Sequence, residues 1–430
     1  MDPELDPELH PELHPELDPG AARDLGPDAR QVSLEDVRAA QKLLRGVSRV
    51  TPLEGSRPLS ARVGGPVHLK CENLQRAGSF KIRGAYVRIA NLSPQERAAG
   101  VVAASAGNHA QGVALAARML GTQSVVYMPK GAPLPKIAAT EGYGAEVRLA
   151  GHTVDEALAA ATGYAAQSGA VLIHPFDHPD VVAGQGTVGL EILEQCPDVR
   201  TIVVCTGGGG LLAGVATAVK SLRPEVRVVG VQAEAAAAYP ASLAAGHPVA
   251  LPSMSTMADG IAVGCPGRVP FRIVAEQVDG MLTVSEESLS RSLLLCLERA
   301  KLVVEPAGAA AVAALLDQPH AFEPPVVAVL TGGNIDPLLL LRVLRHGLAA
   351  AGRYLSLRVR IQDRPGALAR LLAELAESEA NVLDVEHVRT NPKLRLDEVE
   401  VALQLETRGP AHCDEVLDTL RAAGYTLVFS

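Results

Sequence analysis

The sequence predicts an α/β fold with largely parallel sheets, followed by a small α+β unit at the C-terminal end. Between residues 51 and 345, short runs of β-branched residues alternate many times with alanine-rich amphipathic stretches. Such alternation is typical of α/β folds, in which helices connect the strands. Proteins with these folds bind their ligands at the carboxyl ends of the strands. After residue 353 the alternation stops and a different pattern begins. The runs predicted as strands of the first part are Val101–Ser105, Ser124–Met128, Val171–Ile173, Thr201–Thr206, Val226–Gln232 and Val326–Thr331.

Length and composition indicate a globular protein of two or three domains, with 430 residues of which 48% are apolar and 20% charged. The net charge of -9 leaves no basic stripe for nucleic acid, so a small molecule or another protein is the expected partner. The six cysteines are scattered without CxxC or zinc spacing, which indicates reduced thiols. We expect a cytoplasmic location and no membrane contact, because the sequence has neither a long apolar stretch nor a signal-peptide pattern.

The first segment, residues 1–32, is an acidic repeat with proline at every fourth position over most of its length. Proline at that spacing interrupts a helix, and a composition without aromatic residues buries too little surface to offset the entropy of ordering. We therefore expect a disordered tail. Ser33 is the predicted N-cap of a helix that runs through Leu44, with Glu35 and Asp36 in its first turn.

The stretch Gly78–Ala85, GSFKIRGA, is the first of four that carry chemistry. It follows a predicted strand at Val67–Cys71 and opens a helical pattern from Ile82 to Ala90. Lys81 therefore lies at a helix N-terminus, where the helix dipole and partial burial both favour the neutral, nucleophilic amine. Taken alone, a lysine after a serine is more often an ordinary surface residue.

The second stretch is the polar turn Ser105–Gly112, SAGNHAQG, between a predicted strand and a helix that runs through Leu120. It places hydroxyl, amide and backbone N–H groups at the mouth of the sheet, where an anion or a ring oxygen could be held. A simple helix cap by Ser105 or Asn108 explains the turn equally well.

The third stretch holds four successive glycines between a strand and an alanine-rich helix, and the fourth is Thr331–Asp336, TGGNID. Successive glycines let several N–H groups point at one anion, which predicts a phosphate cradle, although neither a GxGxxG nor a Walker motif is present. A flexible turn is the alternative. The Thr331 hydroxyl, at the end of a strand, could bond a ring nitrogen, with another simple turn as the competing interpretation. The residues of the predicted cradle are Gly207, Gly208, Gly209, Gly210 and Leu211.

One ligand matches all four features. Pyridoxal phosphate has an aldehyde for the lysine, a phosphate for the glycines, a ring oxygen for the asparagine loop and a pyridine nitrogen for the threonine. On these motifs the chain resembles the fold-type II (tryptophan synthase β-like) pyridoxal phosphate enzymes, which have a two-lobed core, and within them the threonine ammonia-lyases. Further matching stretches are His174–Asp177, Gly184–Thr187, Ala258–Val263 and Glu305–Ala309.

The resemblance implies a role for each motif. Lys81 would form the Schiff base with the cofactor and later remove the substrate α-proton. Asn108 would bond the ring hydroxyl, the N–H groups of the glycine loop would hold the phosphate, and Thr331 would face the pyridine nitrogen. The implied reaction is the elimination of water from L-threonine to give 2-oxobutanoate and ammonia, the first step of isoleucine biosynthesis, with L-serine as a further substrate and a homo-oligomer as the active form. The substrate carboxylate would be bound by the backbone of Ser105, Ala106, Gly107 and His109.

A serine dehydratase or a serine racemase is the alternative. Similar racemases carry a second serine in the asparagine loop, and Ala106 at that position disfavours racemisation. Several relatives also bind a cation through a glutamate and an aspartate six residues later. Here Glu234 is followed at that spacing by Pro240, so we expect no metal site.

Residues 354–430 have a β-α-β-β-α-β pattern with a D-R-P-G turn after the first strand. This pattern resembles an ACT domain, a ferredoxin-like α+β module that senses amino acids. The resemblance implies feedback control by isoleucine or valine bound at Asp363, Pro365 and Gly366, commonly between paired copies. A purely structural dimerisation module is the alternative. We therefore expect a catalytic domain over residues 33–350 and a regulatory domain over 354–430.

Overall fold

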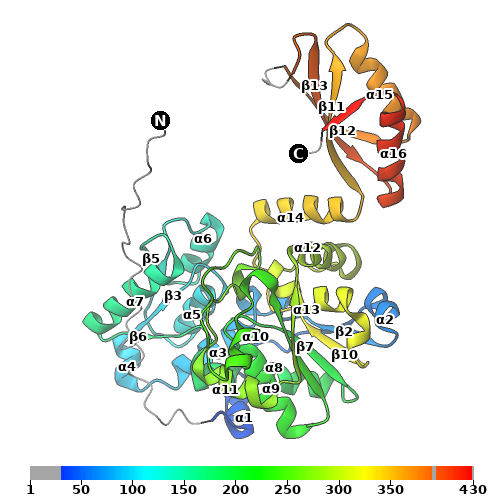
Figure 1. Ribbon diagram of the computed structural model, residues 1–430. Coiled ribbons are helices and arrows are strands. Elements are labelled where there is room, and N and C mark those ends of the chain that lie inside the picture. Colours follow the sequence, from blue (N-terminus) through cyan, green and yellow to red (C-terminus); the bar gives the residue numbers. More distant parts are fainter. Residues whose placement is uncertain (1–30, 390–393, 429–430) are drawn as a thin grey trace, which may run out of the picture.

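The computed structural model describes residues 31–389 and 394–428, so nearly all of the predicted tail lies outside the described residues (Figure 1). The chain is folded from at least Val32, which is buried in the cluster that includes α1 (Leu34–Leu43). Ser33 caps this helix as predicted. Its hydroxyl accepts from the Asp36 N–H, and the Asp36 carboxylate accepts from the Ser33 N–H at 2.9 Å.

A six-stranded sheet forms the centre of the larger of two lobes (Figure 1). Its strands are parallel except at one edge, where β1 pairs antiparallel with β2. The carboxyl ends of the five parallel strands therefore meet at one side of the sheet. In spatial order the strands are β1 (Leu53–Gly55), β2 (Val67–Lys70), β10 (Val326–Val329), β7 (Thr201–Cys205), β8 (Arg227–Ala233) and β9 (Gly280–Val284).

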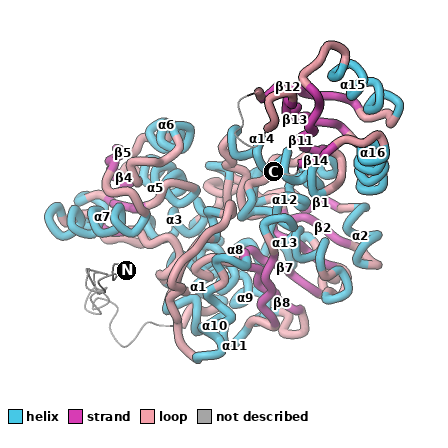
Figure 2. Tube along the Cα trace, turned by 45° about the horizontal axis from the view of Figure 1, so that its top comes forward, coloured by secondary structure: helices cyan, strands magenta, loops and turns pink. Residues whose placement is uncertain are grey.

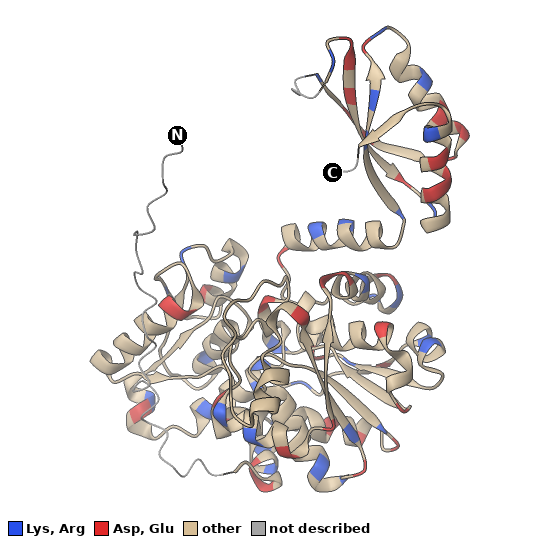
Figure 3. Cartoon of the chain, viewed as in Figure 1, with Lys and Arg blue, Asp and Glu red and all other residues tan. Residues whose placement is uncertain are grey.

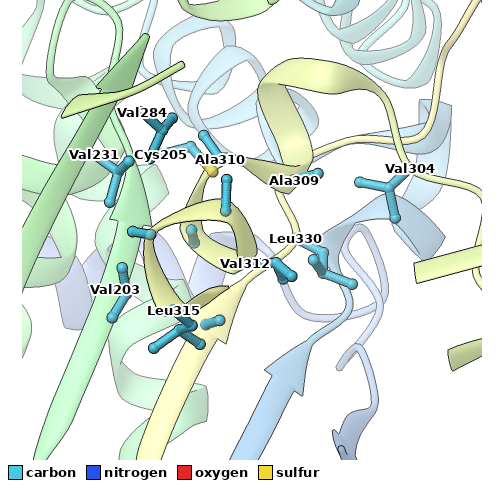
Figure 4. Close-up of a cluster of buried hydrophobic side chains, with 14 of the residues drawn as sticks. Val203, Cys205, Val231, Val284, Val304, Ala309, Ala310, Val312, Leu315 and Leu330 are labelled. Carbon is cyan, nitrogen blue, oxygen red and sulfur yellow. The ribbon is translucent and has the colours of Figure 1, made fainter. Parts of the chain in front are cut away.

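Helices cover both faces of this sheet, because its strands are apolar on both sides. Val203 and Cys205 of β7 pack in one cluster with α13 (Pro306–Asp317), which Figure 4 shows around Ala310. Val204 packs in the opposite cluster with α9 (Gly210–Leu222). The other helices of this lobe, beside α1, are α2 (Arg57–Val63), α8 (Pro179–Gln195), α10 (Ala238–Ala245), α11 (Arg268–Gln277), α12 (Glu286–Leu295) and α14 (Pro337–Ala350).

The smaller lobe is built on a four-stranded parallel sheet. α3 (Lys81–Ala90) packs against α5 of this lobe and against α8 of the larger one, and Figure 2 shows it between them. The seam between the lobes therefore runs along α3. The strands are, in spatial order, β5 (Glu146–Leu149), β4 (Ser124–Met128), β3 (Val101–Ala104) and β6 (Val171–Leu172). The other helices are α4 (Pro94–Ala99), α5 (Asn108–Met119), α6 (Leu134–Gly142) and α7 (Val154–Ser168).

The C-terminal unit is a four-stranded antiparallel sheet with two helices, and its elements follow the β-α-β-β-α-β order that the sequence predicts. Leu357 and Val359 on the inner face of the sheet pack with Leu371 and Val416 of the helices. α14 leads into this unit, where Arg353 forms an ion pair with Glu298 at 2.5 Å. The elements are β11 (Tyr354–Gln362), α15 (Ala367–Glu377), β12 (Asn381–Val388), β13 (Glu398–Glu406), α16 (Pro410–Ala422) and β14 (Thr426–Val428).

The predicted strands agree with the structure within one or two residues, and β4 has the predicted bounds. β10 ends two residues early. The carbonyls of Leu330 and Thr331 accept from the N–H groups of Asn73 and Phe80, at 2.9 and 3.2 Å, instead of from a neighbouring strand. The end of β10 is thereby tied to the segment that leads into α3.

No helix within the described ranges is long and apolar enough to cross a membrane. Residues 31–389 and 394–428 also contain no group of three His, Cys, Asp or Glu side chains placed to hold a metal ion. All six cysteines are free thiols. Acidic and basic residues are interspersed along the helices and strands of both units (Figure 3).

Candidate active site

Lys81 is the first residue of α3 and lies in the seam between the lobes. Gly112 lets α5 approach it, because a Cβ at that glycine would be 3.1 Å from the Lys81 carbonyl carbon. The amine donates to the Pro175 carbonyl at 3.1 Å. Burial lowers the pKa of the Lys81 amine to about 8, and the Glu305 carboxylate opposes part of that shift. About a fifth of this amine is therefore neutral at pH 7.4, far more than for an ordinary lysine.

The glycine loop after β7 is packed tightly on both sides. A Cβ at Gly208 would lie 2.4 Å from the ring of Phe176, and one at Gly209 would lie 1.8 Å from the Tyr239 hydroxyl oxygen. Gly209 also has a φ of 96°, which side chains disfavour. Because α9 begins at Gly210, the N–H groups of its first turn have no acceptor within the helix. The N–H donors of the loop are therefore held in place by the packing of its backbone.

The segment His174–Asp177 joins the lysine to the glycine loop. The Pro175 carbonyl accepts from Lys81, and the Phe176 ring packs on Gly208. The segment is held in shape by the His174 ring, whose Nδ1 accepts from the Asp177 N–H at 2.8 Å. Burial lowers the pKa of His174 to about 4, so the ring stays neutral. The sequence predicts no role for this stretch beyond its match to relatives.

Asn108, the first residue of α5, does not cap its helix, and the interpretation of this residue as a cap is wrong. The N-cap is Gly107, without a side-chain bond. The Asn108 Nδ2 instead donates to Glu305 Oε1 at 2.5 Å, and its Oδ1 accepts from Asn334 Nδ2 at 2.8 Å. Both partners belong to the larger lobe, so this amide bridges the seam.

The other residues of the asparagine loop offer a ligand their backbone N–H groups rather than polar side chains. The Ser105 hydroxyl accepts from the Gly107 N–H at 3.1 Å, and Ala106 brings no polar side chain. The buried His109 ring places Nε2 2.7 Å from the Ile173 carbonyl oxygen, and burial together with the Lys81 charge lowers its pKa to about 3. His109 therefore fixes α5 to the end of β6, and only its backbone N–H can face a ligand.

Thr331 is buried and lies beside the residue that precedes Lys81. Its carbonyl accepts from the Phe80 N–H at 3.2 Å, one residue before the lysine. Its hydroxyl contacts the buried Cys205 thiol, whose pKa burial raises to about 11. The structure thus brings together all four stretches that the sequence singled out, since Asn334 of the same stretch as Thr331 also bonds Asn108.

Glu305 is a further group of this site, and the sequence alone assigns it no role. It occupies the N-cap position of α13 and is buried, with its carboxylate on Asn108. Burial and the nearby Asp259 charge raise its pKa to about 7, although Lys136, Asn108 and Lys81 oppose the rise. The sequence marks this residue in two ways: the stretch Glu305–Ala309 matches relatives, and an acid stands before proline at the start of an alanine-rich helix.

The residues predicted to bind an effector lie far along the chain in the C-terminal unit. Asp363, Pro365 and Gly366 line a cavity of about 290 Å³ between β11 and α15. Arg389, from the end of β12, pairs with the Asp363 carboxylate at 3.2 Å. The remaining lining residues are Ile361, Gln362, Arg364, Leu368, His387 and Val399.

Comparison with known proteins agrees with this geometry. The family model described as "Pyridoxal-phosphate dependent enzyme" matches residues 44–332. The chain belongs to the pyridoxal-phosphate dependent enzymes. An L-threonine ammonia-lyase of Thermotoga maritima is 48% identical over 394 residues, which make up 92% of this chain and 98% of that protein. These family members share fold type II and use pyridoxal phosphate, as does this chain.

Two solved structures of the family show the same core. Threonine deaminase isoform 2 of Solanum lycopersicum, in its processed form, superposes with a TM-score of 0.70 at 39% identity, covering 73% of this chain and 86% of that one. Maize serine racemase has a TM-score of 0.70 at 33% identity and covers 74% of this chain and 99% of that one. Two of the three activities considered from the sequence, threonine deamination and serine racemisation, are thus represented by these structures.

The residues present fit the pyridoxal phosphate of this family. The glycine loop supplies N–H groups that have no acceptor in the helix, as a phosphate needs, and its contacts with Phe176 and Tyr239 leave no room for side chains at Gly208 and Gly209. The fully buried Ser79 hydroxyl, two residues before Lys81, has no hydrogen-bond partner among the described residues. The amine, the amide and the hydroxyl of the other three stretches complete a donor set that matches the cofactor.

Proposed function

We propose that this enzyme deaminates L-threonine to 2-oxobutanoate and ammonia by elimination of water, and that it also acts on L-serine. One observation carries the proposal. The Lys81 amine, whose pKa burial lowers to about 8, lies where the glycine loop, the asparagine loop and Thr331 come together. The 48% identity to an L-threonine ammonia-lyase over almost the whole chain supports the choice of substrate. This reaction is the first step of isoleucine biosynthesis.

When bound, pyridoxal phosphate supplies an aldehyde and a conjugated ring that draws electrons from the substrate Cα. The chain's own groups do the rest. Lys81 would hold the aldehyde and, as a free amine, would take the α-proton. Backbone N–H groups from Gly207 to Leu211 would bind the phosphate, while Asn108 would donate to the ring oxygen. The neutral hydroxyl of Thr331 would lie at the pyridine nitrogen and would supply no charge that favours its protonation.

The substrate carboxylate binds to the backbone of the asparagine loop. The Gly107 N–H is already taken by Ser105, so the N–H groups of Ala106, Asn108 and His109 are the available donors. They lie at the N-terminus of α5, where the helix dipole favours an anion. Ala106 offers no hydroxyl for a proton transfer on the opposite face, which supports elimination over racemisation.

The test is a product analysis of the cofactor-loaded enzyme with L-threonine and L-serine. We expect 2-oxobutanoate and ammonia in equal amounts from L-threonine, a slower release of pyruvate from L-serine, and no product with Lys81→Ala. Formation of D-serine faster than pyruvate would contradict the proposal and support the racemase alternative. Serine turnover without threonine turnover would support a serine dehydratase.

We further propose that residues 33–350 act as the catalytic domain and residues 354–430 as a regulatory domain that binds isoleucine or valine. The cavity at the D-R-P-G turn supports this proposal, since the Asp363 carboxylate and the Arg389 guanidinium match the two charges of a free amino acid. Ile361, Leu368 and Val399 line it with apolar surface for an aliphatic side chain.

An inhibition experiment on the full chain tests the effector site. In Arg389→Ala, the isoleucine or valine concentration that gives half-inhibition should rise at least tenfold, because the carboxylate of the bound amino acid loses its cationic partner. Arg421→Ala, which removes an arginine on α16 of the same unit, is the matched control. It should be inhibited at the same effector concentration as the wild type. Equal inhibition of Arg389→Ala and wild type would rule out this cavity as the effector site.

We place the enzyme in the cytoplasm as a homo-oligomer. The six free thiols support a reducing compartment. β12 lies at an edge of the C-terminal sheet with several exposed residues, and such an edge can pair with a second copy. Light scattering of the purified enzyme distinguishes a monomer, which would contradict this assignment, from a dimer or tetramer.

A further inference from the structure

The Glu305 carboxylate is built into the wall of the active site rather than directed to solvent. It lies at the start of α13, and the structure leaves room for it, since a Cβ at Gly332 would be 2.3 Å from Glu305 Oε1. The same oxygen accepts from Asn108 Nδ2 at 2.5 Å. This is the one side-chain hydrogen bond of Glu305 among the residues that the structure describes, and burying an acid with so few partners costs free energy.

The bonds around Asn108 decide which way its amide points. Its Oδ1 accepts from Asn334 Nδ2 at 2.8 Å, and the same Asn334 nitrogen donates to the Ala77 carbonyl at 2.7 Å. One N–H of Asn108 Nδ2 is used by Glu305. An amide nitrogen has two N–H groups, so Asn108 keeps one donor for a ligand, while its acceptor is already engaged.

We propose that Glu305 is a positioning residue that holds Asn108 as a donor toward the ring oxygen of the cofactor, and that a proton gained or lost by Glu305 changes the protonation state of the bound cofactor. The inference rests on the cofactor roles proposed above for Lys81 and Asn108. It does not depend on which amino acid is the substrate.

Three charged groups face this carboxylate from three elements. Asp259 lies in the turn Asp259–Ile261, Lys136 on α6 of the smaller lobe, and Lys81 on α3. Lys136 and Asp259 form an ion pair across the seam at 2.6 Å. Burial and Asp259 raise the pKa of Glu305 to about 7, so the group changes from mostly neutral to mostly charged as the pH rises through this region.

The charge on Glu305 acts on the cofactor through Asn108. A charged carboxylate close to the ring oxygen opposes further negative charge there, so the bound cofactor keeps its proton to higher pH. A neutral Glu305 lets the proton leave more easily. The visible absorbance of the bound cofactor should therefore show an inflection near pH 7 in the wild type.

A pH titration of the visible absorbance, on the cofactor-loaded full chain without substrate, tests this proposal. Glu305→Gln keeps the size of the side chain and should abolish the inflection. Asp259→Asn removes a like charge and should move the inflection to lower pH, whereas Lys136→Gln removes an opposite charge and should move it higher. Each shift should be up to about 1 pH unit, the usual size of such perturbations. Glu286→Gln is the control, since the Glu286 carboxylate bonds Thr256 and the Met257 N–H and not Asn108. The absorbance of this variant should titrate like that of the wild type.

An inflection that persists in Glu305→Gln overturns the proposal, as do shifts of the same sign in Asp259→Asn and Lys136→Gln. These last two variants decide the matter even where Glu305→Gln fails to fold. The titration also separates this inference from the proposed reaction. An enzyme that shows the predicted shifts but does not deaminate threonine refutes only the reaction, whereas a wild type without a visible cofactor band overturns both.

Discussion

Two polar networks of this enzyme begin on the same helix, two residues apart, and they differ in how completely their charges are paired. Arg83 is fully buried and bonds Glu72 at 2.8 Å and Glu191 at 2.7 Å. Lys70 completes this set with a 2.6 Å bond to Glu191, giving two cations and two anions. Within the part of the chain that the structure describes, Lys81, in contrast, donates only to the Pro175 carbonyl oxygen.

The pKa directions follow that difference. Burial would lower the pKa of Arg83, but Glu72 and Glu191 more than compensate and raise it. Burial would likewise raise the pKa of Glu72, and Arg83 brings it below its usual value. Burial prevails for Lys81, whose pKa falls, and for Glu305, whose pKa rises. Complete pairing keeps buried groups charged and inert, whereas incomplete pairing leaves groups that exchange protons near neutral pH.

Breaking the first network should give the largest loss of stability. Arg83→Ala leaves Glu72 and Glu191 buried without their common partner, and such a change costs about 3–5 kcal/mol of unfolding free energy. Urea unfolding of the cofactor-free protein measures it. Lys81→Ala on the same helix is the control, and it should change this free energy by about 1 kcal/mol or less, because it removes one hydrogen bond to a carbonyl. Equal losses in the two variants would contradict the distinction between the networks.

The glycine loop offers a second, smaller test, directed at the site. Gly208→Ala places a Cβ 2.4 Å from the Phe176 ring, so either the ring or the loop must move. Overpacking of this kind costs about 1–3 kcal/mol. Because the loop presents the phosphate donors, the cost should appear as a cofactor Kd about 5- to 150-fold weaker, measured by equilibrium dialysis. Gly163→Ala on the surface of α7, where a Cβ meets nothing within 4 Å, should leave the Kd unchanged.

The sequence predicted the parts of this enzyme that depend on local pattern. Runs such as Ser124–Met128 are β-branched and flanked by polar turns, so their bounds could be located. β1, β5 and β9 were missed. All three are edge strands, and their partly exposed residues lack the continuous apolar run of a central parallel strand.

The site was predictable where one short motif carries the chemistry, as with Lys81 and the four glycines. It was not predictable where the contact joins distant segments. Glu305 is 197 residues from Asn108, and nothing local marks either as the other's partner. The glycines were expected to make room for a ligand, but Phe176 and Tyr239 also occupy the space beside them. The Arg83 network was missed for the same reason, because its partners come from β2, α8 and the turn after β2.

The lowered pKa of Lys81 predicts how fast the cofactor-free protein takes up pyridoxal phosphate. Uptake needs the neutral amine, so the rate should rise about tenfold per pH unit up to about pH 8 and then level off. The growth of visible absorbance after mixing measures it. Glu305→Gln removes the charge that raises this pKa and should move the plateau to lower pH. A rate that keeps rising to pH 10 would mean that Lys81 titrates like an ordinary lysine.

The smallest effect is expected for an arginine–carboxylate pair with nearly the same distance as the buried one. Arg421 lies 2.9 Å from Asp418 on α16, compared with 2.8 Å between Arg83 and Glu72, but the side chains of this surface pair are 54% and 75% exposed. Water already solvates both charges, so Arg421→Ala should cost about 0–1 kcal/mol of unfolding free energy. Urea unfolding at low and high salt checks this value, which should approach zero as salt screens the pair. A loss comparable to that of Arg83→Ala would show that distance, and not burial, sets the strength of these pairs, and the contrast between the two networks of α3 would lose its physical basis.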